Sequence, residues 1–504
     1  MCQRDIEAGC IQRQTRRGDT SQRPADQHDA VVVAGALSGE IDRSQQISAP
    51  PVVGAGVPVR RHDGDAVAGK QAGQGPHNGA SIGLHTVPQQ DGRLNRIAAY
   101  IGQTSPGILD RLHATSVPRR HESNLRDTAR PYREQVVRAR DTDACPGALQ
   151  VHHAADGAMA RIRLPGGMIT AAQLAALAGI SSSYGSGTLE LTARGNVQVR
   201  GIVDVTAVAE AIATVGLLPS ATHERVRNIV ASPLSGRVGG KADLRAWVGE
   251  LDAAIRAEAR LAELGGRFWF SLDDGRGDVS GLAADVGAHV RDDGVALLLA
   301  GQDTGVRVSD VSEVSDVLAA LVGVALRFLE IRGKAWRVSE LADPTGLLPG
   351  AELGAAFPPV TRAPVGWIPQ EDGRVTLGAA VPLGLLAARV AEYLAAIEAP
   401  LVITPWRSVL VCDLSEDVAD VTLRVLAPLG LVFDENSPWL GVSACTGSPG
   451  CAHSVADVRA DAAASLDHTY PVHRHFVGCE RACGSPLNGE VLVATADGYQ
   501  LLRS

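Results

Sequence analysis

Four cysteines near the end of the chain form two pairs whose spacing could hold an inorganic cofactor. Five residues separate Cys445 from Cys451, and after 27 further residues three separate Cys479 from Cys483. Zinc sites usually place their first two ligands two to four residues apart and close a tetrahedron with two more Cys or His. An iron-sulfur cluster takes one thiolate at each iron corner, and the Gly and Pro residues between Cys445 and Cys451 permit a tight backbone wrap. We therefore expect a 4Fe-4S cluster, with zinc or four unligated thiols as alternatives.

The composition restricts the classes of function. With 504 residues and 45% hydrophobic content, the chain can form several domains with real cores. A net charge of −9 with lysines only at 70, 241 and 334 argues against a general nucleic-acid binder. We find no run of about 18 uncharged apolar residues, so we expect no membrane span. The N-terminal segment lacks the apolar stretch of a secretory signal, and we therefore expect a cytoplasmic protein with reduced cysteines.

Residues 1–136 differ in character from the rest of the chain. They are rich in Gln, Arg, His, Asp and Gly, and their apolar residues follow neither a helical nor a strand period. We interpret them as a disordered extension or as the product of a translation start placed too far upstream. In the second case the working protein would begin near Val136.

Residues 141–218 read as a small unit in which strands and helices alternate. A strand at 160–165 leads through Gly166-Gly167 to a helix that Thr170 can cap and that should end near Gly179. Residues 188–201 alternate apolar and polar side chains around Gly195, which predicts a half-buried strand pair. A second helix is expected at 205–215.

The same pattern returns at residues 365–429, with a strand at 375–382, a helix at 384–397 and a strand region at 401–414. Leu-Glu-Leu-Thr192-Ala-Arg194 matches Leu-Val-Ile-Thr404-Pro-Trp-Arg407, with one residue inserted before the second Arg. We therefore predict two related halves, the alternative being chance similarity between generic α/β units.

The remaining segments lie between and after these halves. Residues 219–345 predict an α/β domain with a helix from Ala242 to about Leu264, a strand-to-turn segment at 268–274 and a strand at 295–300. Residues 346–364 are rich in Pro and Gly and predict a linker. Residues 430–504 carry the four cysteines and end in an expected hairpin with its turn at Asp497-Gly498.

Three motifs together resemble the nitrite and sulfite reductase family. Cys445-x5-Cys451 followed by Gly-Cys479-x3-Cys483-Gly-x-Pro resembles its cluster-binding signature. Leu-Thr-Ala-Arg194-Gly-Asn-Val-Gln198 resembles the T-x-R-x-x-x-Q strand of its ferredoxin-like half domain, and Arg227-Asn228 resembles its R-N segment beside the macrocycle. The likeness covers roughly residues 141–504. It implies an α+β fold of two pseudo-symmetric halves, each a ferredoxin-like half domain plus an α/β domain that binds a cluster or tetrapyrrole.

The resemblance also implies a cleft for a tetrapyrrole with acetate and propionate arms, which Arg binds in a bidentate manner. Asn196 and Gln198 are either hydrogen-bond partners or surface polar residues, and Arg407 either contacts the ligand or forms a structural pair. For each strand arginine, a solvated surface position is the alternative. The residues expected to bind the tetrapyrrole are Arg194, Asn196, Gln198, Arg200, Arg227, Asn228, Arg267 and Arg407.

One departure from the family bears on the reaction. Where the reductases have Lys-x-Lys for an anionic substrate, this chain has Arg267-Phe268-Trp269, a single cation followed by bulky aromatics. That favours a tetrapyrrole substrate over a fixed siroheme. Two segments resemble one branch of the family most, namely Ala144-Cys-Pro-Gly-Ala-Leu149 and residues 268–275. Enzymes of that branch act in the aerobic cobalamin pathway, where they hydroxylate precorrin-3A at C20 and close a γ-lactone. A siroheme-dependent nitrite or sulfite reductase and a non-catalytic electron carrier are the alternatives.

The branch implies dioxygen, precorrin-3A and a 4Fe-4S cluster that delivers electrons. We find no Gly-x-Gly-x-x-Gly after a strand, so a separate reductase, ultimately using NADH, is the expected donor. A further mononuclear nonheme iron is considered, because His473 and His475 would project from one side of a strand near the cysteines, with His453 also close in sequence. Surface histidines are the alternative.

Other candidate residues receive a plainer interpretation. Asp273 and Asp274 could assist a proton transfer but are expected to be a turn pair, and no residue is assigned as catalytic acid or base. Cys145 and Cys412 are expected to be ordinary reduced thiols. Cys2 and Cys10 belong to the N-terminal extension.

Overall fold

The computed structural model describes residues 143–308, 314–467 and 472–503. The expectations for residues 1–136, including Cys2 and Cys10, lie outside this range. Within the described residues, no helix combines the length and the apolar character that crossing a bilayer requires.

The first ferredoxin-like half is built on an antiparallel sheet that helices cover. Its strands are β1 (His152–Ala154), β2 (Gly157–Ile162), β4 (Thr188–Leu191) and β5 (Val197–Ile202), in the order β1-β2-β5-β4. The helices are α3 (Ala171–Tyr184) and α4 (Val205–Thr214). Thr170 and Gln173 form a capping box at the start of α3. The expected end of this helix near Gly179 is wrong: nothing crowds Gly179, and a lone glycine lowers helix stability without ending the helix.

The second half repeats this arrangement. Its strands are β11 (Gly366–Pro369), β12 (Val375–Ala380), β14 (Leu401–Ile403) and β15 (Ser408–Leu414), in the order β11-β12-β15-β14. Its helices are α7 (Ala388–Ala395) and α8 (Glu416–Leu426). The expected helix at 384–397 is shorter, because Leu385–Ala387 form strand β13.

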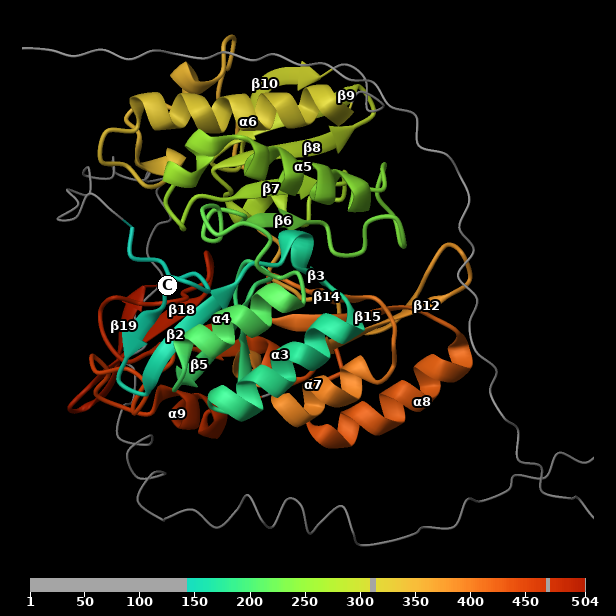
Figure 1. The fold of residues 1–504 in the computed structure, drawn as a ribbon, viewed down its shortest axis with the longest axis vertical. Coiled ribbons are helices and arrows are strands. Elements are labelled where there is room, and N and C mark those ends of the chain that lie inside the picture. The colour runs from blue at the N-terminus through green and yellow to red at the C-terminus, as the bar shows by residue number, and fades with distance from the viewer. Residues whose placement is uncertain (1–142, 309–313, 468–471, 504) are drawn as a thin grey trace, which may run out of the picture. The chain divides into compact units, whose positions relative to one another are not determined.

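The halves exchange a strand. β13 pairs with β4 of the first half, and β3 (Met168–Ile169) pairs with β14 of the second. One apolar core therefore runs through both halves, with buried residues such as Leu174, Leu191, Leu394 and Ile403. The four helices form a row in the order α4-α3-α7-α8, as Figure 1 shows. The two pseudo-symmetric halves are thus confirmed.

The matched turns correct the register of the repeat. Thr192 N donates to Asn196 O and Gly195 N to Thr192 O, and Thr404 N donates to Ser408 O and Arg407 N to Thr404 O in the same way. The predicted insertion before Arg407 is therefore wrong. Arg407 occupies the place of Gly195 and shares its left-handed conformation, with φ of 58° against 65°.

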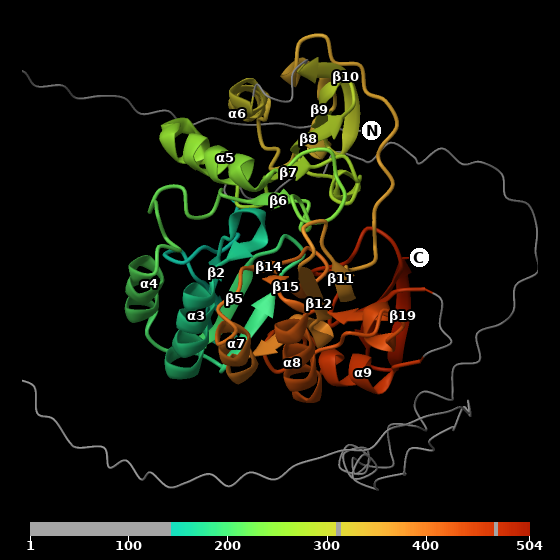
Figure 2. The same cartoon turned by 90° about the vertical axis from the view of Figure 1, so that its right-hand side faces the viewer.

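A third sheet follows the first half. Its strands are β6 (Ile229–Ala231), β7 (Phe270–Asp273), β8 (Val286–Arg291), β9 (Gly294–Leu299) and β10 (Gln302–Val308), and β6, β7 and β8 are parallel. α5 (Arg245–Ala257) and α6 (Val314–Ile331) cover one face, as Figure 2 shows. The predicted helix to Leu264 breaks at Glu258, whose backbone is extended and whose side chain caps a 3-10 turn at Ala259–Glu263.

The fourth sheet carries the cysteine loops. Its strands are β16 (Val442–Ala444), β17 (Arg474–Val477), β18 (Glu490–Thr495) and β19 (Gly498–Arg503), with α9 (Val458–Ala464) between the first two. The order β16-β17-β18-β19 and the strand directions match β6-β7-β8-β9. The expected linker at 346–364 packs along the third sheet, where Phe357 N donates to Gly301 O.

Candidate functional site

A cavity of about 1550 Å³ lies between the first half and the cysteine loops of the fourth sheet. This exceeds the roughly 300–1,000 Å³ typical of small-ligand sites, and it suits a large ligand. All four cysteines of the two pairs line it. Its arginines are Arg161, Arg194, Arg200, Arg267, Arg337, Arg407, Arg459 and Arg481.

The cysteines follow the ends of two parallel strands. Cys445 comes directly after β16, and Gly478 N donates to its Sγ at 3.3 Å. Gly447, with φ of 71°, turns the first loop tightly, and Cys451 N donates to its carbonyl at 2.8 Å. Partial desolvation of the exposed Cys483, followed by the charges of Cys445, Cys479 and Cys451, raises the pKa of its thiol. The other three cysteines are therefore near enough to Cys483 to disfavour its charged form.

Two arginines that line the cavity have no carboxylate partner among the described residues. Arg194 donates to Gly266 O at 3.3 Å and lies 5.7 Å from the centre of the Trp269 ring. Arg407 donates to Gly484 O at 3.2 Å. Burial lowers the pKa of both guanidiniums, that of Arg194 to about 10, with Arg337 and Arg459 as the next causes respectively. Neither forms an ion pair within the described residues, so both can receive an acidic group.

Two other predicted residues line the cavity with their polar groups already engaged. Arg200 forms a bidentate pair with Asp156 at 2.9 and 2.8 Å, and it donates to Gly450 O at 2.9 Å. Gln198 accepts from Arg161 at 2.8 Å and donates to Glu190 at 3.0 Å. Arg200 thus joins the cysteine loop to β5, while Gln198 orients Arg161.

The two asparagines join the first half to the third sheet. Asn196 accepts from Leu164 N at 2.9 Å and donates to Asn228 Oδ1 at 3.2 Å. Asn228 Nδ2 lies within 3.1 Å of three backbone carbonyls, those of Arg225, Gly266 and Phe268. Both side chains border the cavity and stabilise its wall.

The structure does not bring Arg227 to the cavity. Arg227 forms a buried bidentate ion pair with Asp252 of α5, at 2.6 and 3.0 Å. Its guanidinium therefore anchors that helix. Arg267 does reach the cavity, lies 3.4 Å from Asp143 and stacks 5.3 Å from the Trp336 ring. Phe268 and Trp269 are buried. The 267–269 segment therefore presents one cation to the cavity.

The two strand histidines do face the same way, since the Ser443 hydroxyl lies 2.7 Å from both His473 Nε2 and His475 Nδ1. Their other nitrogens contact Leu440 O at 3.2 Å and Cys483 O at 3.0 Å. Burial lowers the pKa of both, that of His475 to about 3 with Arg407 as the next cause. In the described part of the chain, no carboxylate joins them in a metal-ligand group. His453 lines the cavity separately.

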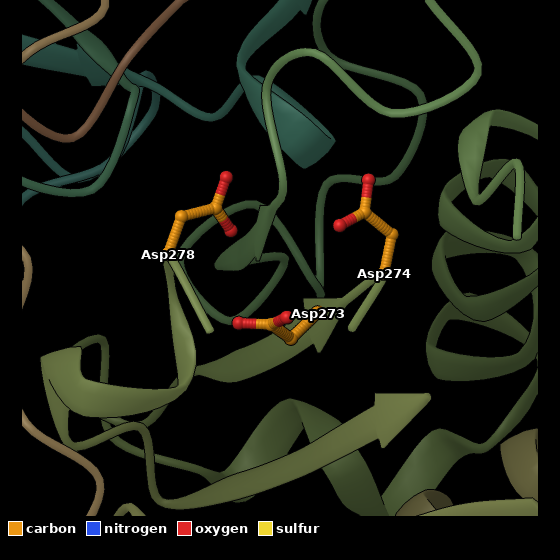
Figure 3. A group of neighbouring side chains, drawn as sticks. All are labelled: Asp273, Asp274 and Asp278. Atoms are coloured by element: carbon orange, nitrogen blue, oxygen red, sulfur yellow. The ribbon is translucent and has the colours of Figure 1, made fainter. Parts of the chain in front are cut away.

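Asp273 and Asp274 form a turn pair at the end of β7, outside the cavity. Asp273 accepts the backbone N–H groups of residues 275, 277, 279 and 280 at 2.9–3.0 Å. Asp274 pairs with Arg276 at 3.0 and 2.8 Å. Figure 3 shows Asp278 beside them, with ligand oxygens of the three within 4.8 Å of one another. Burial, and then Asp273, raise the pKa of Asp278 to about 6.

Several cavity residues were missed by the sequence reasoning. Cys145, expected to be an ordinary thiol, lies in the cavity wall 3.0 Å from Arg161 Nη1. The Cys-Pro-Gly sequence could have indicated Cys145. The position of Arg161 in a strand shortly before Pro-Gly-Gly could have indicated that residue. Arg337 and Arg459 stand in segments without a strand pattern and gave no signal. Cys412 is buried, and burial raises the pKa of its thiol to about 11, as fits an ordinary core cysteine.

The chain is similar to proteins of the nitrite/sulfite reductase family. Residues 151–215 match the family model "Nitrite/Sulfite reductase ferredoxin-like half domain". A precorrin-3B synthase from a Sinorhizobium species is 27% identical over 388 residues, covering 71% of this chain and 82% of that protein. A ferredoxin–nitrite reductase from Synechococcus elongatus is 25% identical over 383 residues, covering 65% and 74%.

A solved structure supports the fold alone. The Mycobacterium tuberculosis NirA protein superposes with a TM-score of 0.56 at 21% identity, covering 68% of this chain and 74% of that one. Residues 151–215 thus match a domain of the nitrite/sulfite reductases, and most of the described chain is similar to members of that family. The named relatives support an oxidoreductase enzyme.

Proposed function

We propose that this protein is an oxygen-dependent oxidoreductase acting on a tetrapyrrole, namely a precorrin-3B synthase. It would hydroxylate precorrin-3A at C20 and close a γ-lactone. The observation that carries the proposal is the cavity, which is lined both by four cysteines and by arginines that have no carboxylate partner among the described residues. The similarity to the Sinorhizobium protein, over most of both chains, supports it.

The cysteines suit a 4Fe-4S cluster as the resident cofactor. The hydrogen bond from Gly478 N to Cys445 Sγ is of the kind that tunes cluster sulfurs. A zinc tetrahedron with Zn–S of about 2.3 Å would bring its sulfurs to about 3.8 Å from one another. Among the described residues, the only ligand group within 4.8 Å is the three-aspartate one. When bound, the cluster would supply electrons one at a time, taken from an external reductase that ultimately uses NADH.

The arginine wall would bind and orient the substrate. Carboxylate arms of a tetrapyrrole can accept two N–H donors from one guanidinium, and a buried site strengthens that pair. Arg194 and Arg407 approach from opposite pseudo-symmetric halves, so together they would fix both the position and the rotation of the macrocycle. The Arg200 contact to Gly450 O would hold the cysteine loop against its face.

A siroheme-dependent nitrite or sulfite reductase is the second candidate. Cys483 is exposed where the other three thiols are half-buried, which would suit contact with a heme iron. The similarity to nitrite reductase over 65% of the chain also favours it. The single cation that the 267–269 segment offers for a small anion favours the first candidate.

The deciding experiment is turnover by anaerobically purified protein. Precorrin-3A, a reductant and ¹⁸O₂ are expected to give a product heavier by one ¹⁸O atom. The purified protein is expected to show a cluster spectrum without macrocycle bands. An unchanged substrate mass with the cluster intact would contradict the proposed synthase activity. Strong siroheme bands together with nitrite or sulfite reduction would support the second candidate.

A further inference from the structure

The loop Ala144–Leu149 is held rigidly although the proposed function gives it no role. The Glu224 carboxylate accepts N–H groups from Ala148, Leu149 and Gln150 at 2.5, 2.7 and 3.0 Å. A Cβ atom on Gly147 would overlap that carboxyl group, so the carboxylate can approach the loop only because residue 147 is glycine. Residues 147–150, which follow Cys145 closely, are therefore fixed against Glu224, and this restricts the position of Cys145.

The cysteine itself is fixed from the other side. Cys145 N donates to Asp143 Oδ1 at 3.1 Å, and Arg163 Nη2 donates to Pro146 O at 3.1 Å. Gly266 packs against its β-carbon, where any larger residue would come within 2.8 Å. Cys145 is left half-buried in the cavity wall.

Two guanidiniums face that sulfur. Arg161 Nη1 lies 3.0 Å and Arg163 Nη2 3.7 Å from Sγ. A guanidinium can only donate hydrogen bonds, so the sulfur is the acceptor in both contacts. Reactive cysteines typically occupy such electropositive, partly exposed settings, and the thiolate is the form that attacks.

Arg163 supplies an independent reason for an anion here. Its side chain is 2% exposed, and its Nη1 has no hydrogen-bond partner among the described residues. A buried cation without an anionic partner is costly. The guanidinium already faces Sγ, so a negative charge on Cys145 would compensate it.

We propose that Cys145 is a reactive cysteine in the cavity wall and a modification site for small electrophiles and hydrogen peroxide, which it attacks as the thiolate. With iodoacetamide, the sulfur forms a bond to the methylene carbon and iodide leaves. With peroxide, the sulfur attacks one oxygen and the O–O bond breaks. The sulfur is oxidised by two electrons to a sulfenic acid, and the other oxygen leaves as hydroxide.

The test is the rate of alkylation of anaerobically purified holoprotein by iodoacetamide at pH 6.5, resolved by peptide mapping. We expect Cys145 to react at least tenfold faster than the same cysteine in a synthetic peptide of residues 141–149. Buried Cys412 is the internal control and should stay unmodified. Arg161→Gln should slow Cys145 at least tenfold, and Arg161→Lys should restore most of the rate, because it keeps the cation.

The proposal is overturned if Cys145 reacts no faster than the peptide, or if Arg161→Gln leaves its rate unchanged. Circular dichroism and the cluster absorbance would verify that each variant is folded before its rate is used. Low peroxide followed by a 1,3-dione probe should label Cys145 in the native protein, and labelling of other cysteines alone would contradict the proposal. None of these readouts requires precorrin-3A, so they stand apart from the turnover test.

Discussion

At the scale of single residues, the partner of each arginine decides what that arginine can do. Among the described residues, the side chains of Arg194 and Arg407 donate to backbone carbonyls and to no carboxylate, while Arg200 and Arg227 each hold an aspartate in a bidentate pair. A guanidinium already neutralised by a buried carboxylate gains little from a second one and costs much to release. Ligand binding should therefore depend on Arg194 and Arg407, and the stability of the fold on Arg200 and Arg227.

Arg194→Gln and Arg227→Gln form a matched test of this division. Arg194→Gln should weaken binding of an octacarboxylate porphyrin about tenfold or more, since a charge-assisted hydrogen bond contributes roughly 1.5–3 kcal/mol. Its unfolding free energy should change little. Arg227→Gln leaves Asp252 buried with only the Arg256 contact and should cost about 3–5 kcal/mol of stability. Optical titration and urea unfolding measure the two effects, and equal binding losses in both variants would refute the division.

Asp278 should make stability depend on pH. Its folded-state pKa of about 6 lies above the ordinary 3.8, so the folded protein binds this proton more tightly than the unfolded chain. The favourable contribution is fully present below pH 3.8 and is lost as pH rises through 6. Asp278→Asn should therefore stabilise the protein by roughly 3 kcal/mol at pH 7.5 and by less than about 1 kcal/mol at pH 4.

Urea unfolding at the two pH values measures this difference. Asp372→Asn is the control, because Asp372 is 55% exposed beside Arg374 and should change stability by less than about 0.5 kcal/mol. A pH-independent effect of Asp278→Asn would show that the carboxyl group is not the cause.

At the scale of elements, the two pseudo-symmetric turns show how the halves are locked together. Gly195 has a φ of 65°, and a Cβ atom there would come 2.7 Å from Ile403 O in the other half. Gly187 has a φ of 73° with nothing within 4 Å. Gly187→Ala should thus cost only the left-handed strain of about 1–2 kcal/mol.

Gly195→Ala should cost clearly more, roughly 3 kcal/mol or above, because the same strain is joined by a clash with backbone. Thermal or urea unfolding of the two variants gives the comparison. Equal losses would mean that strand exchange between β3 and β14 does not require the close approach at Gly195.

The sequence predicted elements whose signal is local and missed relations that depend on distant segments. The capping box at Thr170, the alternating strands at 188–201 and the final hairpin rest on neighbouring residues. The strand exchange, the Arg227 pair with Asp252 and the place of Cys145 arise from contacts between segments far apart in the chain. The Arg407 turn was misaligned because an arginine stands where the first half has glycine, so residue identity concealed the shared backbone.

At the scale of the whole molecule, stability is unevenly distributed. The two halves share one extended core, whereas the main apolar cluster of the fourth sheet consists of Val442, Val458, Ala462, Phe476 and Ala494. A core of that size stabilises little by itself. The cysteine loops project from this same sheet, and Arg200 is one tie from them to the first half. Metal binding can supply the missing folding free energy of such a region.

Removal of the proposed cluster should therefore loosen the fourth sheet first. After anaerobic chelation, amide hydrogen exchange in β16, β17 and β18 should accelerate at least tenfold, equivalent to a loss of about 1.4 kcal/mol in local stability. Amides of β5 and β15, in the shared core, should change less than about twofold. Cys479→Ser should reproduce the pattern without a chelator, whereas Cys412→Ser, which alters a thiol outside the site, should not. Uniform acceleration across all sheets would instead mean that the cluster stabilises the molecule as one cooperative unit, because exchange would then proceed through global unfolding.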